Sequence, residues 1–258
     1  MADFVARLGS RASVPGEVRS RFGVEEYAGL LVGDDRPLPD LRHGRLSPSA
    51  LDALLRALAV RPSAELNRAR LAAVTGIPPT TIAPYVAALV TLGHVRLVPG
   101  ARAAVAKRAI ARPRVVFEDP ALARRLAGDD PAGLTEMDGR ARLAPYLEGI
   151  AAAELLRQQA TSEVDYRVTH LRERNGLEVD LLVELPDETV YGLEVRTAAG
   201  FRPHQFRNLE ALAARAGSSF RGGIVLNTAP VGFKYRPGMW GLPISALWEW
   251  DDRRPGAD

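Results

Sequence analysis

Residues 175–196 read NGLEVDLLVELPDETVYGLEVR, and this stretch decides the fold of the C-terminal part of the chain. Its first two residues, Asn-Gly, are a turn pair that favours a two-residue β-hairpin loop. A second turn follows at Pro186-Asp187-Glu188. The apolar runs around the two turns predict three successive strands, over 164–172, 177–184 and 190–196.

Helical patterns surround these strands. One helix is predicted over 145–159, before the strands, and another over 203–216, after them. Apolar strands are then expected at 223–226 and near 240–242. Helices packed on a mixed central sheet give an α/β domain, which we assign to residues 140–258.

An upstream region predicts three helices and a short strand. Ser47-Pro48 is a strong helix start, an Asn67 cap opens a second helix that ends at Gly76, and a third helix carries Ile82 to Val90. The strand over 95–98 follows. This order is typical of a winged helix-turn-helix, which we assign to residues 41–128, leaving residues 1–40 as a short helical or linker segment.

The positive charge of the chain is concentrated in this upstream region. Residues 41–128 hold fourteen Arg or Lys against four Asp or Glu, whereas the net charge of the whole chain is +3, so the remainder carries about −7. Such asymmetry favours nucleic acid as the partner of the basic part and a cation for the acidic part. Ordinary solvated surface explains the same charges equally well.

Several classes of protein are excluded by composition. The 258 residues include no cysteine, which excludes disulfides, thiol nucleophiles and Cys-based zinc sites, and the four histidines are not spaced as ligands. There is no apolar run of eighteen residues and no signal peptide, so we expect a cytoplasmic protein with no membrane contact. Neither a GxSxG nor a GxGxxG motif is present.

Three residues in the opening stretch are the candidate catalytic centre: Asp180, Glu194 and Arg196. Acids on neighbouring strands of a hairpin lie side by side, and a third carboxylate from the preceding helix, Glu148 or Glu154, completes an oxygen-rich cage for Mg²⁺. Such a cage suits phosphodiester hydrolysis, because the metal polarises the phosphoryl group and activates water. Ion pairs between two strands, with no metal, are an equally good interpretation of these residues.

The basic residues of the upstream region lie on and after the wing. The candidate nucleic-acid contacts are Arg96, Arg102, Lys107, Arg108, Arg112 and Arg114. The third helix exposes Thr and Ala rather than side chains that match base edges, and Pro84 is expected to bend it. We therefore expect weak, sequence-independent binding of duplex DNA through phosphates. Packing against a second copy or a protein partner remains an alternative.

The ordered segments resemble a known family. YLEGIAAAELLRQ, NGLEVDLLVE, GLEVR, FRPHQFRNLEALA, GGIVLN and WGLPISALW look like the C-terminal region of a large bacterial and archaeal ATPase family. Members have a P-loop ATPase domain, a winged helix and a domain of unknown function with the PD-(D/E)XK, or restriction-endonuclease-like, fold. The resemblance implies that Asp180 is the motif aspartate, that Glu194 and Arg196 stand at the (D/E) and K positions, and that Glu148 is the helical glutamate.

Two departures from the family limit what is carried over. No GxxxxGK[ST] motif occurs, so we expect no ATP binding. Arg196 replaces a lysine, and a guanidinium cannot exchange a proton near neutral pH. Three hypotheses stay open: a nucleic-acid-associated protein with a degenerate or weakly active nuclease-like site, an active Mg²⁺-dependent DNA endonuclease, and a non-catalytic interaction or regulatory module.

Overall fold

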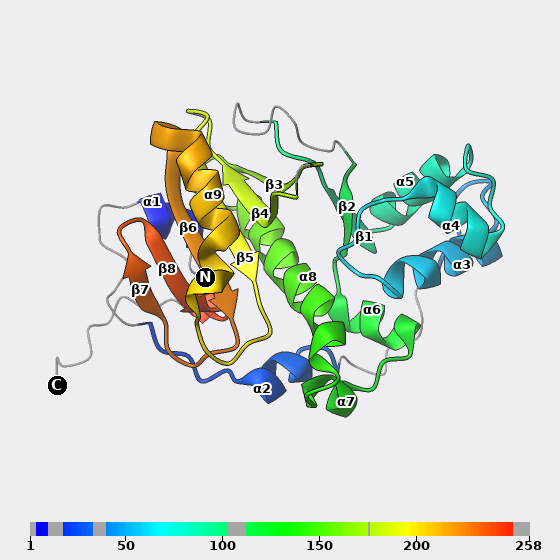
Figure 1. Cartoon of the computed structure of the whole chain (residues 1–258). Helices are drawn as coiled ribbons and strands as arrows, with labels where there is room; N and C mark the ends of the chain where they lie inside the picture. The colour runs from blue at the N-terminus through cyan, green and yellow to red at the C-terminus, as the bar shows by residue number, and fades with distance from the viewer. Residues whose placement is uncertain (1–3, 10–17, 33–39, 103–111, 175, 250–258) are drawn as a thin grey trace. The chain divides into compact units, whose positions relative to one another are not determined.

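The computed structural model describes residues 4–9, 18–32, 40–102, 112–174 and 176–249 (Figure 1). These residues fall into two compact units. The sheet unit contains the described residues up to Val24, residues 101–102 and those from Glu154 onward. The helical unit contains those from Glu25 to Gly100 and from 112 to Ala153. The protein is thus an α/β protein with a helical region and a β-hairpin followed by a mixed six-stranded sheet.

Local capping signals set the first long helices of the helical unit: α3 (Pro48–Ala59), α4 (Arg68–Thr75) and α5 (Ile82–Thr91). The Ser47 hydroxyl accepts a hydrogen bond from the Ala50 amide at 3.3 Å, and the Asn67 side chain accepts one from the Arg70 amide at 3.0 Å. Gly76 ends α4 with a φ of 72°, a conformation that glycine adopts without strain. All three predicted helices are confirmed.

Pro84 does not cost α5 a hydrogen bond. It is the third residue of the helix, where an amide N–H would have no partner within the helix in any case. Sequence reasoning had placed it about one turn into the helix, at a position where proline bends a helix.

A two-stranded antiparallel hairpin follows, made of β1 (Val95–Val98) and β2 (Arg114–Phe117). β1 has the predicted bounds, whereas β2 was not predicted. All four residues of β2 are buried, and the carbonyls of Val115 in the strand and Pro113 before it accept hydrogen bonds from the Ser63 and Leu66 amides, in the segment before α4. The strand therefore forms through contacts with residues distant in sequence.

Three further helices complete this region: α6 (Pro120–Ala127), α7 (Pro131–Thr135) and α8 (Arg140–Gln159), while α2 (Val24–Gly29) precedes α3 in the chain. The first two start on aspartate caps that sequence reasoning did not use. α8 begins five residues earlier than predicted, with Pro145 inside it. The Pro145 carbonyl accepts a hydrogen bond from the Ser63 hydroxyl at 3.0 Å.

The sheet has the strand order β3-β4-β5-β6-β8-β7 (Figure 1). Its strands are β3 (Arg167–Arg172), β4 (Glu178–Glu184), β5 (Val190–Val195), β6 (Phe220–Asn227), β7 (Phe233–Arg236) and β8 (Met239–Pro243). β3, β4 and β5 are antiparallel neighbours, whereas β5, β6 and β8 run parallel. The mixed sheet was predicted; the exposed edge strand β7 was not. Asn175, half of the predicted hairpin turn, lies outside the described residues.

Glycines on the sheet let the helical segment after β5 approach closely. This segment begins with a 3₁₀ turn, η2 (Pro203–Phe206), and continues as α9 (Arg207–Ala216). A Cβ atom on Gly192 would lie 2.8 Å from the Leu209 side chain. Side chains are therefore excluded where the helix crosses β5, and the first turn of α9 is held beside the end of that strand.

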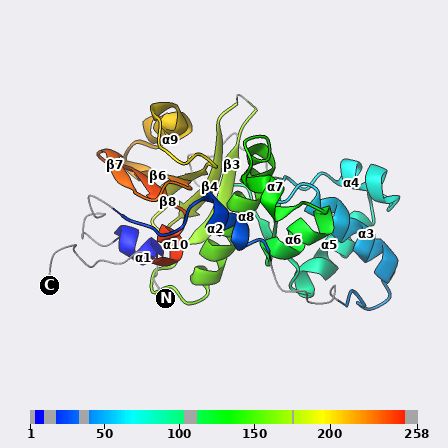
Figure 2. The same ribbon diagram turned by 90° about the horizontal axis from the view of Figure 1, so that it is seen from below.

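The N-terminal segment is built into the sheet unit. The Phe4 amide of α1 (Phe4–Gly9) donates to Gln158 Oε1 at 3.0 Å, and the Tyr191 hydroxyl donates to the Leu8 carbonyl at 3.1 Å. Figure 2 shows α1 beside α10 (Ala246–Glu249), which it contacts. Phe4 is fully buried, so this helix contributes to the core and is more than a connector. In the part of the chain that the structure describes, no helix has the length and hydrophobicity needed to cross a membrane.

Candidate functional site

The acids Asp180 and Glu194 lie on neighbouring antiparallel strands, as the sequence predicted. β4 and β5 pair with Leu181 opposite Leu193, and extending this register by one pair places Asp180 opposite Glu194. Both residues are buried, with relative exposures of 6% and 1%. Their carboxylates lie near enough for the charge of Asp180 to raise the pKa of Glu194.

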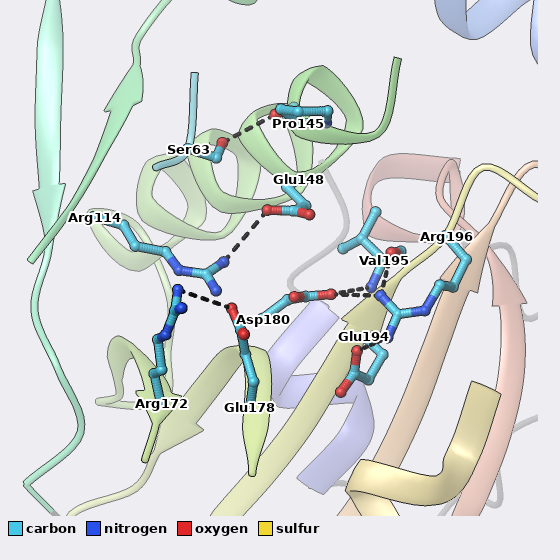
Figure 3. Close-up of polar contacts among 10 residues, drawn as sticks. All are labelled: Ser63, Arg114, Pro145, Glu148, Arg172, Glu178, Asp180, Glu194, Val195 and Arg196. Carbon is cyan, nitrogen blue, oxygen red and sulfur yellow. Dashed lines mark hydrogen bonds and ion pairs between the residues drawn. The ribbon is translucent and has the colours of Figure 1, made fainter. Parts of the chain in front are cut away.

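Arg196 holds the two acids together (Figure 3). Its Nη1 donates to Asp180 Oδ2 at 2.9 Å, and its Nη2 donates to Glu194 Oε2. Nη1 also donates to the Val195 carbonyl at 2.7 Å. The predicted pairing of Arg196 with these acids is therefore confirmed, and the guanidinium lies where it contacts both carboxylates at once.

Two further donors bind the same carboxylates. The Val195 amide donates to Asp180 Oδ2 at 2.9 Å, and Asn208 Nδ2, from the first turn of α9, donates to Glu194 Oε1 at 3.1 Å. Sequence reasoning did not name Asn208; it considered Gln205 and Arg207 for this cleft but preferred surface placement for both. Gln205 is instead buried and bonded to the backbone of Arg202 at 3.0 Å, where it closes the loop before η2.

Burial and neighbouring charges shift the pKa values of Glu194 and Arg196. Burial raises the pKa of Glu194 well above its usual range, and the charge of Asp180 adds to the effect, while Arg196 and Asn208 oppose it. Burial alone would lower the pKa of Arg196, but Glu194 and Asp180 outweigh it and the pKa is raised. Arg196 therefore stays positively charged, and Glu194 takes up a proton more readily than an ordinary glutamate does.

The two candidate third carboxylates have other partners. Glu148 belongs to the helical unit, where it accepts a hydrogen bond from Arg114 Nη1 at 3.3 Å (Figure 3). Glu154 lies in the sheet unit with a side chain only 11% exposed, and it bonds Arg157 and Gln158 of its own helix. Each carboxylate is therefore engaged locally.

A metal ion does not fit the acid pair as it is arranged. Three of the four carboxylate oxygens of Asp180 and Glu194 accept hydrogen bonds from protein donors, and the guanidinium of Arg196 occupies the space beside them. Across the described ranges, no group of three or more histidine or carboxylate side chains is arranged to hold an ion. Hydrolysis through a bound metal therefore has no support in this geometry.

The predicted nucleic-acid contacts have diverse environments. Arg96 pairs with Glu118, and Arg114 is buried, with a side chain 7% exposed, against Glu148. Arg102 and Arg112 are exposed. Lys107 and Arg108 lie outside the described residues.

Two family models match the chain. Residues 144–247 match one described as a domain of unknown function (DUF4143), and residues 35–133 match another described as a domain of unknown function (DUF8612). No curated protein and no solved structure matches the chain. The chain is therefore similar, in two successive parts, to two domains of unknown function.

Proposed function

We propose that this chain is a nucleic-acid-associated protein that retains a PD-(D/E)XK nuclease-like scaffold but has lost metal-dependent cleavage. One observation carries the proposal: the Arg196 guanidinium donates to both Asp180, at 2.9 Å, and Glu194. In a working site of this kind the two acids bind Mg²⁺ through their oxygens. Here an arginine binds those oxygens instead.

The chemistry of arginine supports the loss of activity. Lysine is a compact point charge that can stand near an attacking water, whereas a guanidinium is planar and forked and matches two carboxylate oxygens. Asp180 and Glu194 are nine-tenths or more buried, so Arg196 compensates two charges that would otherwise be costly. Replacement of the arginine by a metal would require its two ionic hydrogen bonds and its bond to the Val195 carbonyl to break together.

The helical unit supports the association with nucleic acid. The succession of α3, α4, α5 and the β1–β2 hairpin is the order of a winged helix-turn-helix, and residues 41–128 carry ten more positive than negative charges. The two ends of α5 expose uncharged side chains, those of Thr80, Thr81 and Thr91. Binding through phosphates, without reading of base edges, is the mode that this distribution favours.

A plasmid-nicking assay tests the loss of cleavage. The parent, Arg196→Lys and Asp180→Ala are compared with Mg²⁺ or Mn²⁺. We expect no cleavage by the parent or by Asp180→Ala, and a gain in Arg196→Lys would identify a lapsed site whose acids still work. Parental cleavage that disappears in Asp180→Ala would overturn the proposal in favour of an active endonuclease.

A DNA-binding titration tests the association separately. We expect the parent to bind duplex DNA of unrelated sequences with similar affinity and with a steep dependence on salt, because phosphate contacts release counterions. Absence of binding even at low salt would contradict the association and favour a protein-interaction module.

A further inference from the structure

We infer that the junction of α3 and α4 is the surface through which the helical unit binds the phosphate backbone of duplex nucleic acid. Its residues are Arg61 and Arg70, with Arg68 beside them, and we refer to them as the α3–α4 corner. The inference rests on the proposed association with nucleic acid and names the surface that makes the contact. None of these three arginines was among the candidates predicted from the sequence.

At least five arginines of the helical unit form ion pairs with acids of the same unit. Arg42 bonds Asp40 at 2.7 Å and Arg56 bonds Asp52 at 2.8 Å; Arg96 and Arg114 of the wing are paired as well. Their positive charge is therefore largely compensated before any ligand arrives.

The corner arginines differ from these paired arginines. Arg61, Arg68 and Arg70 are exposed, and none has a carboxylate partner among the described residues. An exposed guanidinium with no internal partner keeps all five of its N–H donors for water or a ligand. The corner thus brings together uncompensated positive charges in a unit where at least five other arginines are paired with acids.

Two of the corner arginines converge in space. Arg61, which follows α3, and Arg70, in the first turn of α4, line the same shallow hollow together with Asn67. Arg68 lies two residues before Arg70, about 200° around the helix axis, so it places positive charge on the opposite side of α4. Glu65 also lines the hollow, and the arginines outnumber it.

The position of these arginines is unfavourable for the helix itself. Arg68 and Arg70 lie in the first turn of α4, which contains no acidic residue. A positive charge there opposes the partial positive charge of the helix N-terminus, so these two charges do not stabilise the end of the helix. The Arg70 amide is already bonded to Asn67, so the ligand contacts we infer come from the side chains.

A row of phosphates suits this arrangement better than an acidic protein segment does. A duplex presents negative charge continuously along its backbone, which matches arginines spread over two sides of a helix end. The guanidinium fork also matches pairs of phosphate oxygens. Because the exposed threonines of α5 are uncharged, the corner would position the duplex without selecting its sequence.

Binding of a short labelled duplex by the full-length chain, followed by fluorescence anisotropy over a series of salt concentrations, tests the inference. Arg61→Ala/Arg70→Ala is compared with the parent and with Arg42→Ala/Arg56→Ala, which removes the same charge from paired arginines of the same unit. We expect the corner variant to bind about tenfold more weakly, with a salt slope smaller by about 2, and the control to stay within about twofold. The variant Arg61→Lys/Arg70→Lys should retain most of the parent's salt slope.

The outcomes separate the inference from the proposed function. If the parent binds and the corner variant binds equally well with the same slope, the corner is not the contact surface, and the association stands. If corner and control variants weaken alike, net charge alone explains binding and the inference is wrong. If the parent does not bind, the proposed association itself fails and takes the inference with it.

Discussion

Replacing Arg196 with alanine tests whether this arginine compensates buried charge. The guanidinium bonds Asp180 and Glu194, whose side chains are 9% and 1% exposed, while its own side chain is 33% exposed. Deleting one partner of a buried ion pair costs about 3–5 kcal/mol. Because the Arg196 side chain is partly exposed, solvent screening reduces this cost. We therefore expect a loss of about 2–3 kcal/mol in the free energy of unfolding.

Thermal and chemical unfolding near neutral pH measure this loss. In a chain of this size, 1 kcal/mol lowers the Tm by about 2–4 °C, so the Tm should fall by roughly 5–10 °C. The matched control is Arg221→Ala, which also removes an arginine bonded to a carboxylate, that of Asp187 at 2.7 Å, but with both side chains about half exposed at 51% and 50%. We expect no measurable change in the control, because exposed ion pairs contribute little.

The pH dependence makes the test more specific. The pKa of Glu194 is already raised by burial and by the charge of Asp180. Loss of Arg196 removes an opposing influence, so a proton on Glu194 should restore part of the lost stability as the pH falls below neutral. If Arg196→Ala has the same Tm as the parent at every pH, or a Tm no lower than that of Arg221→Ala, the arginine does not hold the acid pair together.

Three further predictions follow from the structure. The raised pKa of Glu194 means that its charged form destabilises the fold, so stability of the parent should decline as the pH rises above about 4.5, and Glu194→Gln should flatten that decline in denaturant titrations. A Cβ on Gly241 would lie 2.5 Å from the Phe201 ring, so Gly241→Ala should lower the free energy of unfolding by about 1–3 kcal/mol, and an unchanged denaturation midpoint would contradict this packing. If the basic residues between β1 and β2 in the chain also contact DNA, anisotropy should show weaker binding and a flatter salt slope, without loss of Tm, on alanine replacement of Lys107, Arg108 and Arg112.

The parts of the fold that the sequence predicted are those fixed by local signals. The Ser47 and Asn67 caps and the glycine after α4 set helix ends within a few residues, and no distant contact was needed to find them. β2 was missed because its residues form a strand only by pairing with β1 and with the segment around Ser63. β7 was missed because it is an exposed edge strand whose one partner, β8, comes later in the chain.

In the site, too, local patterns predicted some residues, whereas others depend on the tertiary structure. Alternation along two antiparallel strands was enough to place Asp180 beside Glu194, since the side-chain period of a strand is two residues. Asn208 could not be found in this way, because its direction depends on the 3₁₀ turn before α9, which shifts the phase of the helix. The bond between Arg114 and Glu148 joins residues that sequence reasoning had assigned to two separate roles.

Asp180 has a use in this sheet that does not depend on a metal. Its Oδ2 accepts the Val195 amide at 2.9 Å, so the carboxylate satisfies a buried backbone donor at the end of β5 as well as the arginine. Loss of an acceptor for a buried N–H group costs about 1–3 kcal/mol. The fold therefore gives a reason to keep this aspartate even where no phosphodiester is cut, and its presence alone is not evidence of catalysis. Among Asp180, Glu194 and Arg196, the arginine is the most informative residue. A lysine ammonium in its place would compensate the same charge from one point. The guanidinium instead spans both acids and binds the oxygens that a catalytic ion would need.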